Sequence, residues 1–393
     1  MTAPEARAVS LAVPIGAGVV TALVGFTSSF AVVLTGLRAA GATEAQAASG
    51  LFALSLIMGF GIVGLALRYR IPLTLAWSTP GAALLAGTGA VVGGWPAAVG
   101  AFVVVGLAIV LTGAWPRLGA LVASIPVSLA QAMLAGVILP LCLEPVRALA
   151  ASPVAVAPVV VTWLVLQRFS PRWAVPAAFG VAAVVIGVAL LRSGTAVPTD
   201  GLVPTLSPVA PVWTWQAAVG VALPLYIVTM ASQNIPGTAV MASYGYTVPW
   251  RASMTVTGAA TAAAAPVGAF AVNLAAISAA LAASPDAEPD RDRRWIAAVT
   301  AGVAYLVLAV GSAALATLVA LAPAGIVETV AGLALLGTLA SALAASTQHP
   351  SDRVPAAITF VVAASGVAVV GIGSAFWALV AGLVVRAVTA DRG

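Results

Sequence analysis

Residues 71–87 read IPLTLAWSTPGAALLAG, and this stretch changes character in its middle. Its first half is short, rich in strand-forming residues, and entered through Pro72, which favours extended backbone. Its second half has the signals of a helix start, because Ser78 or Thr79 can cap the first turn and Pro80 fits that turn without loss of a hydrogen bond. We therefore expect a short extended piece that leads into a half-helix.

The composition of the chain is that of a membrane protein. Hydrophobic residues make up 62% of the 393 residues and charged residues 7%, whereas about 25% of a soluble domain is charged. Apolar runs of about 20 residues, the length that crosses a bilayer as a helix, recur along the chain. We expect residues 1–393 to form a single integral membrane domain with the lipid bilayer as its surroundings.

A broken helix has a specific meaning in a membrane. Irregular backbone at bilayer depth is tolerated only where it is buried in protein or lines a cavity, and the free N–H groups of a helix start attract anions. Transporters with inverted repeats build their substrate sites in this way. The stretch 71–90 is therefore our first candidate for a binding site.

The hydrophobicity pattern predicts an all-α polytopic membrane protein of fourteen segments. The third segment, 71–90, is the broken element described above. The other segments are 10–37, 45–68, 96–114, 121–142, 153–168, 174–192, 213–243, 251–266, 267–283, 295–320, 324–345, 354–369 and 371–388. A count of twelve full spans stays open, because omission of two short segments in compensating places preserves the alternation.

Arginine placement supports this topology. All 16 basic residues are arginines, and a cytoplasmic N-terminus puts thirteen of them inside and only Arg38, Arg147 and Arg192 outside. This is the positive-inside bias, and it predicts that both termini are cytoplasmic. The net charge of +5 is explained by topology and does not indicate a nucleic-acid partner.

Seven segments, a polar loop and seven more predict two inverted repeats, 10–192 and 213–388. The counterpart of the third segment is then the tenth, in which a short extended piece ends at Asn273 and a half-helix follows from Leu274 to Ala283. Weak sequence matches between the two halves occur in the same order, which supports the alignment.

Gln233 and Asn234 stand side by side in an apolar segment, directly before Pro236-Gly237. Amides are unfavourable in a bilayer unless they are hydrogen-bonded. They either face the site and bind polar atoms of the substrate, or they join neighbouring helices while Pro236 kinks the segment.

Other polar residues leave the same choice open. Ser28 and Ser29 in the first segment either bind substrate or satisfy themselves on their own helix, and Ser78, Thr79 and Asn273 can both cap helices and contact ligand. Glu328 either carries a coupled proton or lies at a helix start near the interface, where the dipole favours it.

The sequence contains no metal-binding motif, no catalytic triad at membrane depth and no nucleotide-binding loop. We expect no cofactor, no metal and no enzymatic activity, so transport would depend on an ion gradient.

At these residues the chain resembles the benzoate/proton symporter (BenE) family. The resemblance lies in 76–82 (AWSTPGA), 232–237 (SQNIPG), Gly245-Tyr246 and 273–277 (NLAAI). It implies a secondary active transporter of the bacterial inner membrane, for proton-coupled uptake of benzoate or a similar small aromatic carboxylate. The family is similar in architecture to nucleobase and sulfate transporters with seven-plus-seven inverted repeats.

That architecture implies a core domain from 10–114 and 213–320 and a gate domain from 121–192 and 324–388. Substrate would lie between the third and tenth segments. We expect the N–H groups of Thr79–Gly81 (with Pro80 at the turn) and Asn273–Ala275 (with Leu274) to hold the carboxylate, because no arginine is expected at that depth. The candidate walls for the ring are Phe30, Trp77 and Phe270.

Two alternatives remain open. One is a transporter of the same fold for another anion or a nucleobase, and the other is an uncoupled channel or membrane scaffold. By analogy, the gate domain could also form a homodimer.

Overall fold

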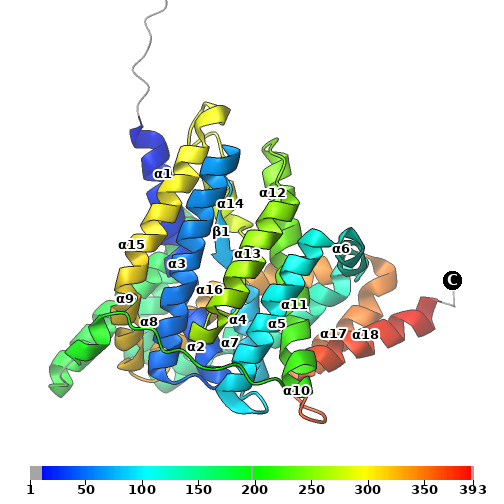
Figure 1. Cartoon of the computed structure of the whole chain (residues 1–393). Coiled ribbons are helices and arrows are strands. Elements are labelled where there is room, and N and C mark those ends of the chain that lie inside the picture. Colours follow the sequence, from blue (N-terminus) through cyan, green and yellow to red (C-terminus); the bar gives the residue numbers. More distant parts are fainter. Residues whose placement is uncertain (1–10, 196–197, 391–393) are drawn as a thin grey trace, which may run out of the picture.

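The computed structural model describes residues 11–195 and 198–390, so the predicted cytoplasmic Arg7 and Arg392 lie outside the described residues. The chain is a bundle of membrane helices with two short strands in its interior (Figure 1). Eight helical stretches among the described residues are long and apolar enough to cross a membrane. The polytopic helical membrane protein is therefore confirmed, whereas the fourteen-segment inverted repeat stays a prediction.

The first half of the chain, up to residue 193, contains nine helices and strand β1 (Leu75–Trp77) in its described residues. The helices are α1 (Ala12–Thr27), α2 (Phe30–Ala39), α3 (Glu44–Tyr69), α4 (Thr79–Thr88), α5 (Gly94–Ala114), α6 (Pro116–Ala123), α7 (Val127–Ala151), α8 (Pro153–Phe169) and α9 (Pro171–Ser193).

The second half contains strand β2 (Val272–Leu274) and a further set of helices. The helices are α10 (Trp215–Ala217), α11 (Leu223–Thr229), α12 (Ile235–Ser243), α13 (Trp250–Ala264), α14 (Ile277–Ala283), α15 (Trp295–Ala320), α16 (Ile326–Ser346), α17 (Arg353–Ala364) and α18 (Ser374–Ala390).

Strands β1 and β2 pair antiparallel, with Ala76 opposite Asn273. The pairing continues past both ends of the strands: Ser78 N–H donates to the Ala271 carbonyl at 3.0 Å, and Ala275 N–H donates to the Thr74 carbonyl at 3.1 Å. Peptide groups at bilayer depth need partners inside the protein, and each broken element supplies them to the other. Figure 1 shows β1 among the helices, near the middle of the long helix α3.

Several boundaries differ from the predictions, among them those of the first, fifth and eighth segments. The first segment is broken at Ser28–Ser29 into α1 and α2, where an unbroken span was expected. Helix α7 extends to Ala151, so Glu144 lies inside it and pairs with Arg147 at 2.8 Å. The ion pair connects neighbouring turns of the helix.

The third difference concerns the eighth segment, which is continuous but contains two wide π-helical turns, Ala218–Ala222 and Met230–Asn234. Each wide turn comes just before a proline, Pro224 or Pro236. Proline has no N–H for the preceding turn and crowds its carbonyl, and an extra residue in that turn relieves the conflict. Such turns are frequent at functional sites.

Asp352 joins three elements outside the membrane spans. Its carboxylate accepts hydrogen bonds from Ser128 Oγ of α7 at 2.7 Å and from Arg386 Nε of α18 at 3.0 Å. The Ser128 hydroxyl, followed by Arg386, lowers the pKa of the Asp352 carboxyl below its usual value. A lowered pKa in the folded state stabilises the protein at every pH above the ordinary aspartate pKa of about 4.

We therefore expect Asp352→Asn to lower the free energy of unfolding by about 1 kcal/mol at pH 7. The difference from the wild type should narrow as the pH falls below about 4, because the native carboxylate then becomes protonated as well. Thermal unfolding in detergent at pH 7 and at lower pH measures this, with the exposed Asp286→Asn as control. A difference that stays constant into the acid range would contradict the assignment.

Candidate functional site

Ser78 is the N-cap of the first half-helix, α4. Its Oγ accepts hydrogen bonds from Gly81 N–H at 3.1 Å and from Thr229 Oγ1 at 2.9 Å, and its carbonyl accepts from Ala82 N–H at 2.8 Å. The Ser78 side chain is fully buried. Since Pro80 has no N–H, Thr79 is the one residue at this helix start whose N–H remains for a ligand.

The second half-helix begins later than predicted. Helix α14 starts at Ile277, and the predicted start at Leu274 is wrong because residues 272–274 pair with β1. The expected donors are also occupied: Leu274 N–H donates to Asn234 Oδ1 at 2.9 Å, and Ala275 N–H donates to the Thr74 carbonyl. Asn273 is fully buried and donates to the Leu274 carbonyl at 2.8 Å.

The neighbouring amides Gln233 and Asn234 therefore have different roles. Asn234 is fully buried, with Oδ1 on the backbone of β2 and Nδ2 against the sulfur of Met230 at 3.1 Å. Gln233 is half-buried and lines a cavity. Within the wide turn 230–234, Gln233 thus faces the cavity and the next residue, Asn234, supports β2.

That cavity has a volume of about 220 Å³ and lies where the two broken elements cross. Among the sequence-predicted site residues, it is lined by Ser28, Ser29, Trp77, Thr79, Pro80 and Gln233. Its other walls include Met58 of α3, Ala276 and Ser278 at the start of α14, Tyr305 of α15, Val175 and Pro176 of α9, and Ala334 and Thr338 of α16.

The remaining predicted residues lie behind this lining. Ser78, Asn234 and Asn273 are buried supports, as described above, and Gly81 and Leu274 place their N–H groups on those supports. Two expected wall residues, Phe30 and Phe270, are fully buried in the core instead. The Phe30 ring packs against Phe26 and Phe179, and the Phe270 ring packs against Phe102.

Trp77 is the best-fixed wall of the cavity. Its indole N–H donates to Ser29 Oγ at 2.8 Å, and Ser29 Oγ in turn donates to the Gly25 carbonyl at 3.2 Å, at the break between α1 and α2. The indole meets Phe26 and Tyr305 edge to face, with ring centroids 5.3 and 6.3 Å apart. Such contacts hold an aromatic ring in one orientation, so Trp77 offers a preformed apolar surface.

Sequence reasoning missed the contribution of α9. Arg172, the second residue of this helix, lines the cavity, so the prediction that no arginine reaches the site is wrong. The sequence prediction places it between the segments 153–168 and 174–192. Helix α9 instead begins at Pro171, which is a favoured first helical residue and was the available signal.

Glu328 is placed as a helix cap. Its carboxylate accepts from Gly325 N–H at 3.1 Å at the start of α16, and it does not line the cavity. This arrangement favours the dipole alternative for Glu328. Its role as a proton carrier stays a prediction.

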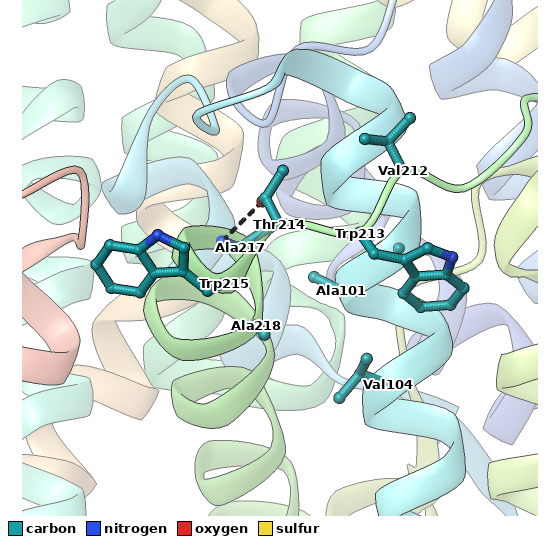
Figure 2. A pocket seen from close by; sticks show the side chains of 9 residues that line it. Ala101, Val104, Val212, Trp213, Thr214, Trp215, Ala217 and Ala218 are labelled. Carbon is teal, nitrogen blue, oxygen red and sulfur yellow. Dashed lines mark hydrogen bonds between the residues drawn. The ribbon is translucent and has the colours of Figure 1, made fainter.

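A second hollow, of about 260 Å³, lies between α5 and the stretch that leads into α10 (Figure 2). Figure 2 shows Trp213 and Trp215 pointing in opposite directions, and both residues are more than half exposed. The Thr214 hydroxyl is already used, because it accepts from Ala217 N–H at 3.2 Å. The hollow offers a ligand few polar partners, and its tryptophans resemble interfacial anchors.

Comparison with known proteins fits this arrangement. The family described as "BenE: Benzoate membrane transport protein" matches residues 9–388. The chain belongs to the BenE family. It is therefore a membrane transporter of that family. It is 39% identical over 382 residues to "Inner membrane protein YdcO" of Escherichia coli (strain K12), with 96% of each chain covered. It is 29% identical to "Benzoate membrane transport protein" of Acinetobacter baylyi, over 93% of this chain and 92% of that one.

Solved structures share the fold of the BenE chain. The transmembrane domain of the cyanobacterial bicarbonate transporter BicA matches with a TM-score of 0.61 at 13% identity, and 97% of each chain is covered. SLC26A9 matches with a TM-score of 0.62 at 11% identity, over 94% of this chain and 65% of that one. At such low identity the likeness is one of fold.

The two neighbouring amides of this BenE transporter give a direct test of their separate roles. Asn234→Ala should lower the free energy of unfolding by about 1–3 kcal/mol, because it leaves the buried Leu274 N–H unpaired. Gln233→Ala should change it by less than about 0.5 kcal/mol, as for other side chains without a buried partner. Thermal or denaturant unfolding in detergent measures both. Equal losses in the two variants would contradict the division.

Proposed function

We propose that the chain is a secondary active transporter of the bacterial inner membrane that takes up benzoate or a similar aromatic carboxylate together with protons. The observation that carries this proposal is the cavity at the crossing of β1 and β2. It combines a fixed aromatic wall, Trp77, with unused polar groups at the start of α4.

The size and walls of the cavity suit one aromatic ring. A protein cavity of about 150 Å³ lined by apolar side chains binds benzene, and this cavity measures about 220 Å³. The difference leaves room for a carboxylate. Trp77, Pro80, Val175 and Pro176 provide apolar surface around it.

The carboxylate would bind at the start of α4. Thr79 is partly exposed and brings a hydroxyl and a backbone N–H to the cavity, at the positive end of the helix dipole. Gln233 adds an amide donor, and Ser278 adds a hydroxyl from the side of α14. Hydrogen bonds to a charged group contribute about 1.5–3 kcal/mol each, which is enough to orient the ring.

The position of the cavity fits alternating access. Trp77, Thr79 and Gln233 belong to the proposed core domain, 10–114 and 213–320, whereas Val175 and Thr338 belong to the proposed gate domain, 121–192 and 324–388. Substrate between the two sets would be exposed to one side at a time as they move against each other. We also propose that the chain consists of two inverted repeats, 10–192 and 213–388, and that it forms a homodimer through the gate domain.

The relative from Acinetobacter baylyi, which is named as a benzoate transport protein, supports the substrate class. Proton coupling is our further expectation. The cavity lining contains no carboxylic acid in the described part of the chain, so the proton would travel on the substrate carboxylate itself or on a group outside the cavity, such as Glu328.

A second candidate, transport of a small inorganic anion, is favoured by the fold shared with the bicarbonate transporter BicA. Competition separates the two: excess unlabelled benzoate should suppress uptake of labelled benzoate, and excess bicarbonate should not. Uptake that ignores an imposed pH gradient would instead favour an uncoupled channel.

The site itself is tested in proteoliposomes with labelled benzoate. Thr79→Val and Gln233→Ala should each raise the KM about tenfold, because each removes a hydrogen-bond donor to the carboxylate. Thr88→Val is the matched control, since Thr88 lies at the other end of α4 and bonds only its own helix, at the Leu84 carbonyl. An unchanged KM in both site variants would refute the proposed site.

A further inference from the structure

Arg172 is the one charged side chain among the described residues that line the cavity. It is the second residue of α9, so it lies at the positive end of its own helix dipole. A cation there is unfavourable by about 0.3–1 kcal/mol. Its position is therefore not explained by the stability of α9.

Within residues 11–195 and 198–390, Arg172 has no ion pair, hydrogen bond or aromatic ring contact of its own. The ion pairs of the described chain involve Arg38, Arg147 and Arg386. Other arginines are held in different ways: Arg294 is buried on three carbonyl oxygens, and Arg70 stacks on Trp295. The exposed guanidinium of Arg172 is thus available to a ligand.

The surroundings of Arg172 reinforce its charge. No acidic side chain lines the cavity in the part of the chain that the structure describes, so nothing in the lining neutralises this guanidinium, and the positive end of the α4 dipole adds to it. Arg172 and Thr79 line the same cavity, from α9 and α4 respectively.

We propose that Arg172 determines the charge selectivity of the transporter, by attracting anionic ring compounds into the cavity in preference to neutral ones. The inference rests on the proposed function and deepens it. The guanidinium is planar and presents its donors as a fork that matches a carboxylate. An exposed cation acts largely through long-range attraction, which salt screens.

Two variants separate the charge of the Arg172 side chain from its forked shape. Arg172→Gln removes the charge and keeps a polar side chain, whereas Arg172→Lys keeps the charge and loses the fork. The neutral probe is benzamide, which has the ring of benzoate without its charge. The matched control is Arg168→Gln, because Arg168 lies at the end of the neighbouring helix α8, is exposed, and contacts only the Phe169 ring.

In proteoliposomes, Arg172→Gln should raise the KM for benzoate about three- to tenfold at low salt. Benzamide should inhibit benzoate uptake by Arg172→Gln with the same inhibition constant as it does for the wild type. Raising the salt concentration should increase the wild-type KM toward that of Arg172→Gln, which should itself be insensitive to salt. Arg172→Lys should stay within about twofold of the wild type, since attraction by charge is retained.

Three results would overturn the inference: an Arg172→Gln variant with the wild-type KM and salt dependence, an equal loss of benzoate and benzamide recognition, or an equal effect of Arg168→Gln. Failure of the wild type to take up benzoate would instead refute the proposed function. The same variants and salt series, with the anion that the wild type does take up, would then decide the role of Arg172.

Discussion

The structure depends on the need to pair every peptide group at the level where two membrane elements stop being helical. Lipid offers no partner for a free N–H or C=O, so strands β1 and β2 satisfy each other, and the bonds from Ser78 and Ala275 extend the pairing at both ends. Side chains satisfy N–H groups that the ladder leaves unpaired: Asn234 accepts from Leu274, and Ser78 accepts from Gly81 as the cap of α4. Polar residues in the middle of the bundle are therefore explained first by backbone pairing.

This requirement divides the polar residues into two layers. The buried layer, which includes Ser78, Asn234 and Asn273, fixes the broken backbone and has no free surface for substrate. The cavity layer consists of the neighbours of these residues in the sequence, such as Trp77, Thr79 and Gln233. A rigid inner layer of this kind places the binding groups accurately, which is what a site needs in order to select one substrate shape.

Much of this arrangement could be predicted from local sequence, and the reasons are physical. Pro80 after Ser78 and Thr79 marks a helix start wherever it occurs, and that start lies within one residue of the prediction. The same reasoning predicts a helix start directly after Asn273, whereas the helix begins at Ile277. Asparagine is a good helix cap, but here the chain remains extended through Leu274. The backbone of residues 272–274 pairs with β1, and Leu274 N–H donates to Asn234 instead of entering a helical turn.

Residues brought together from distant segments were harder to predict. Local pattern does not say which helix faces which, so Phe30 and Phe270 were taken for walls although they pack into the core, and Arg172 was taken for a loop residue although it reaches the cavity. Only the three-dimensional packing of α9 against α1, α8 and α16 reveals such a contribution. Arg172 changes the electrostatics of the site, because its positively charged guanidinium adds to the positive end of the α4 helix dipole.

The most direct test of the account is an experimental structure of the transporter with benzoate bound. The account predicts one ring in the cavity against Trp77, with its carboxylate within hydrogen-bond distance of the Thr79 N–H or hydroxyl. A ring bound in the hollow beside Trp213 and Trp215, or strands β1 and β2 that are not paired, would contradict it.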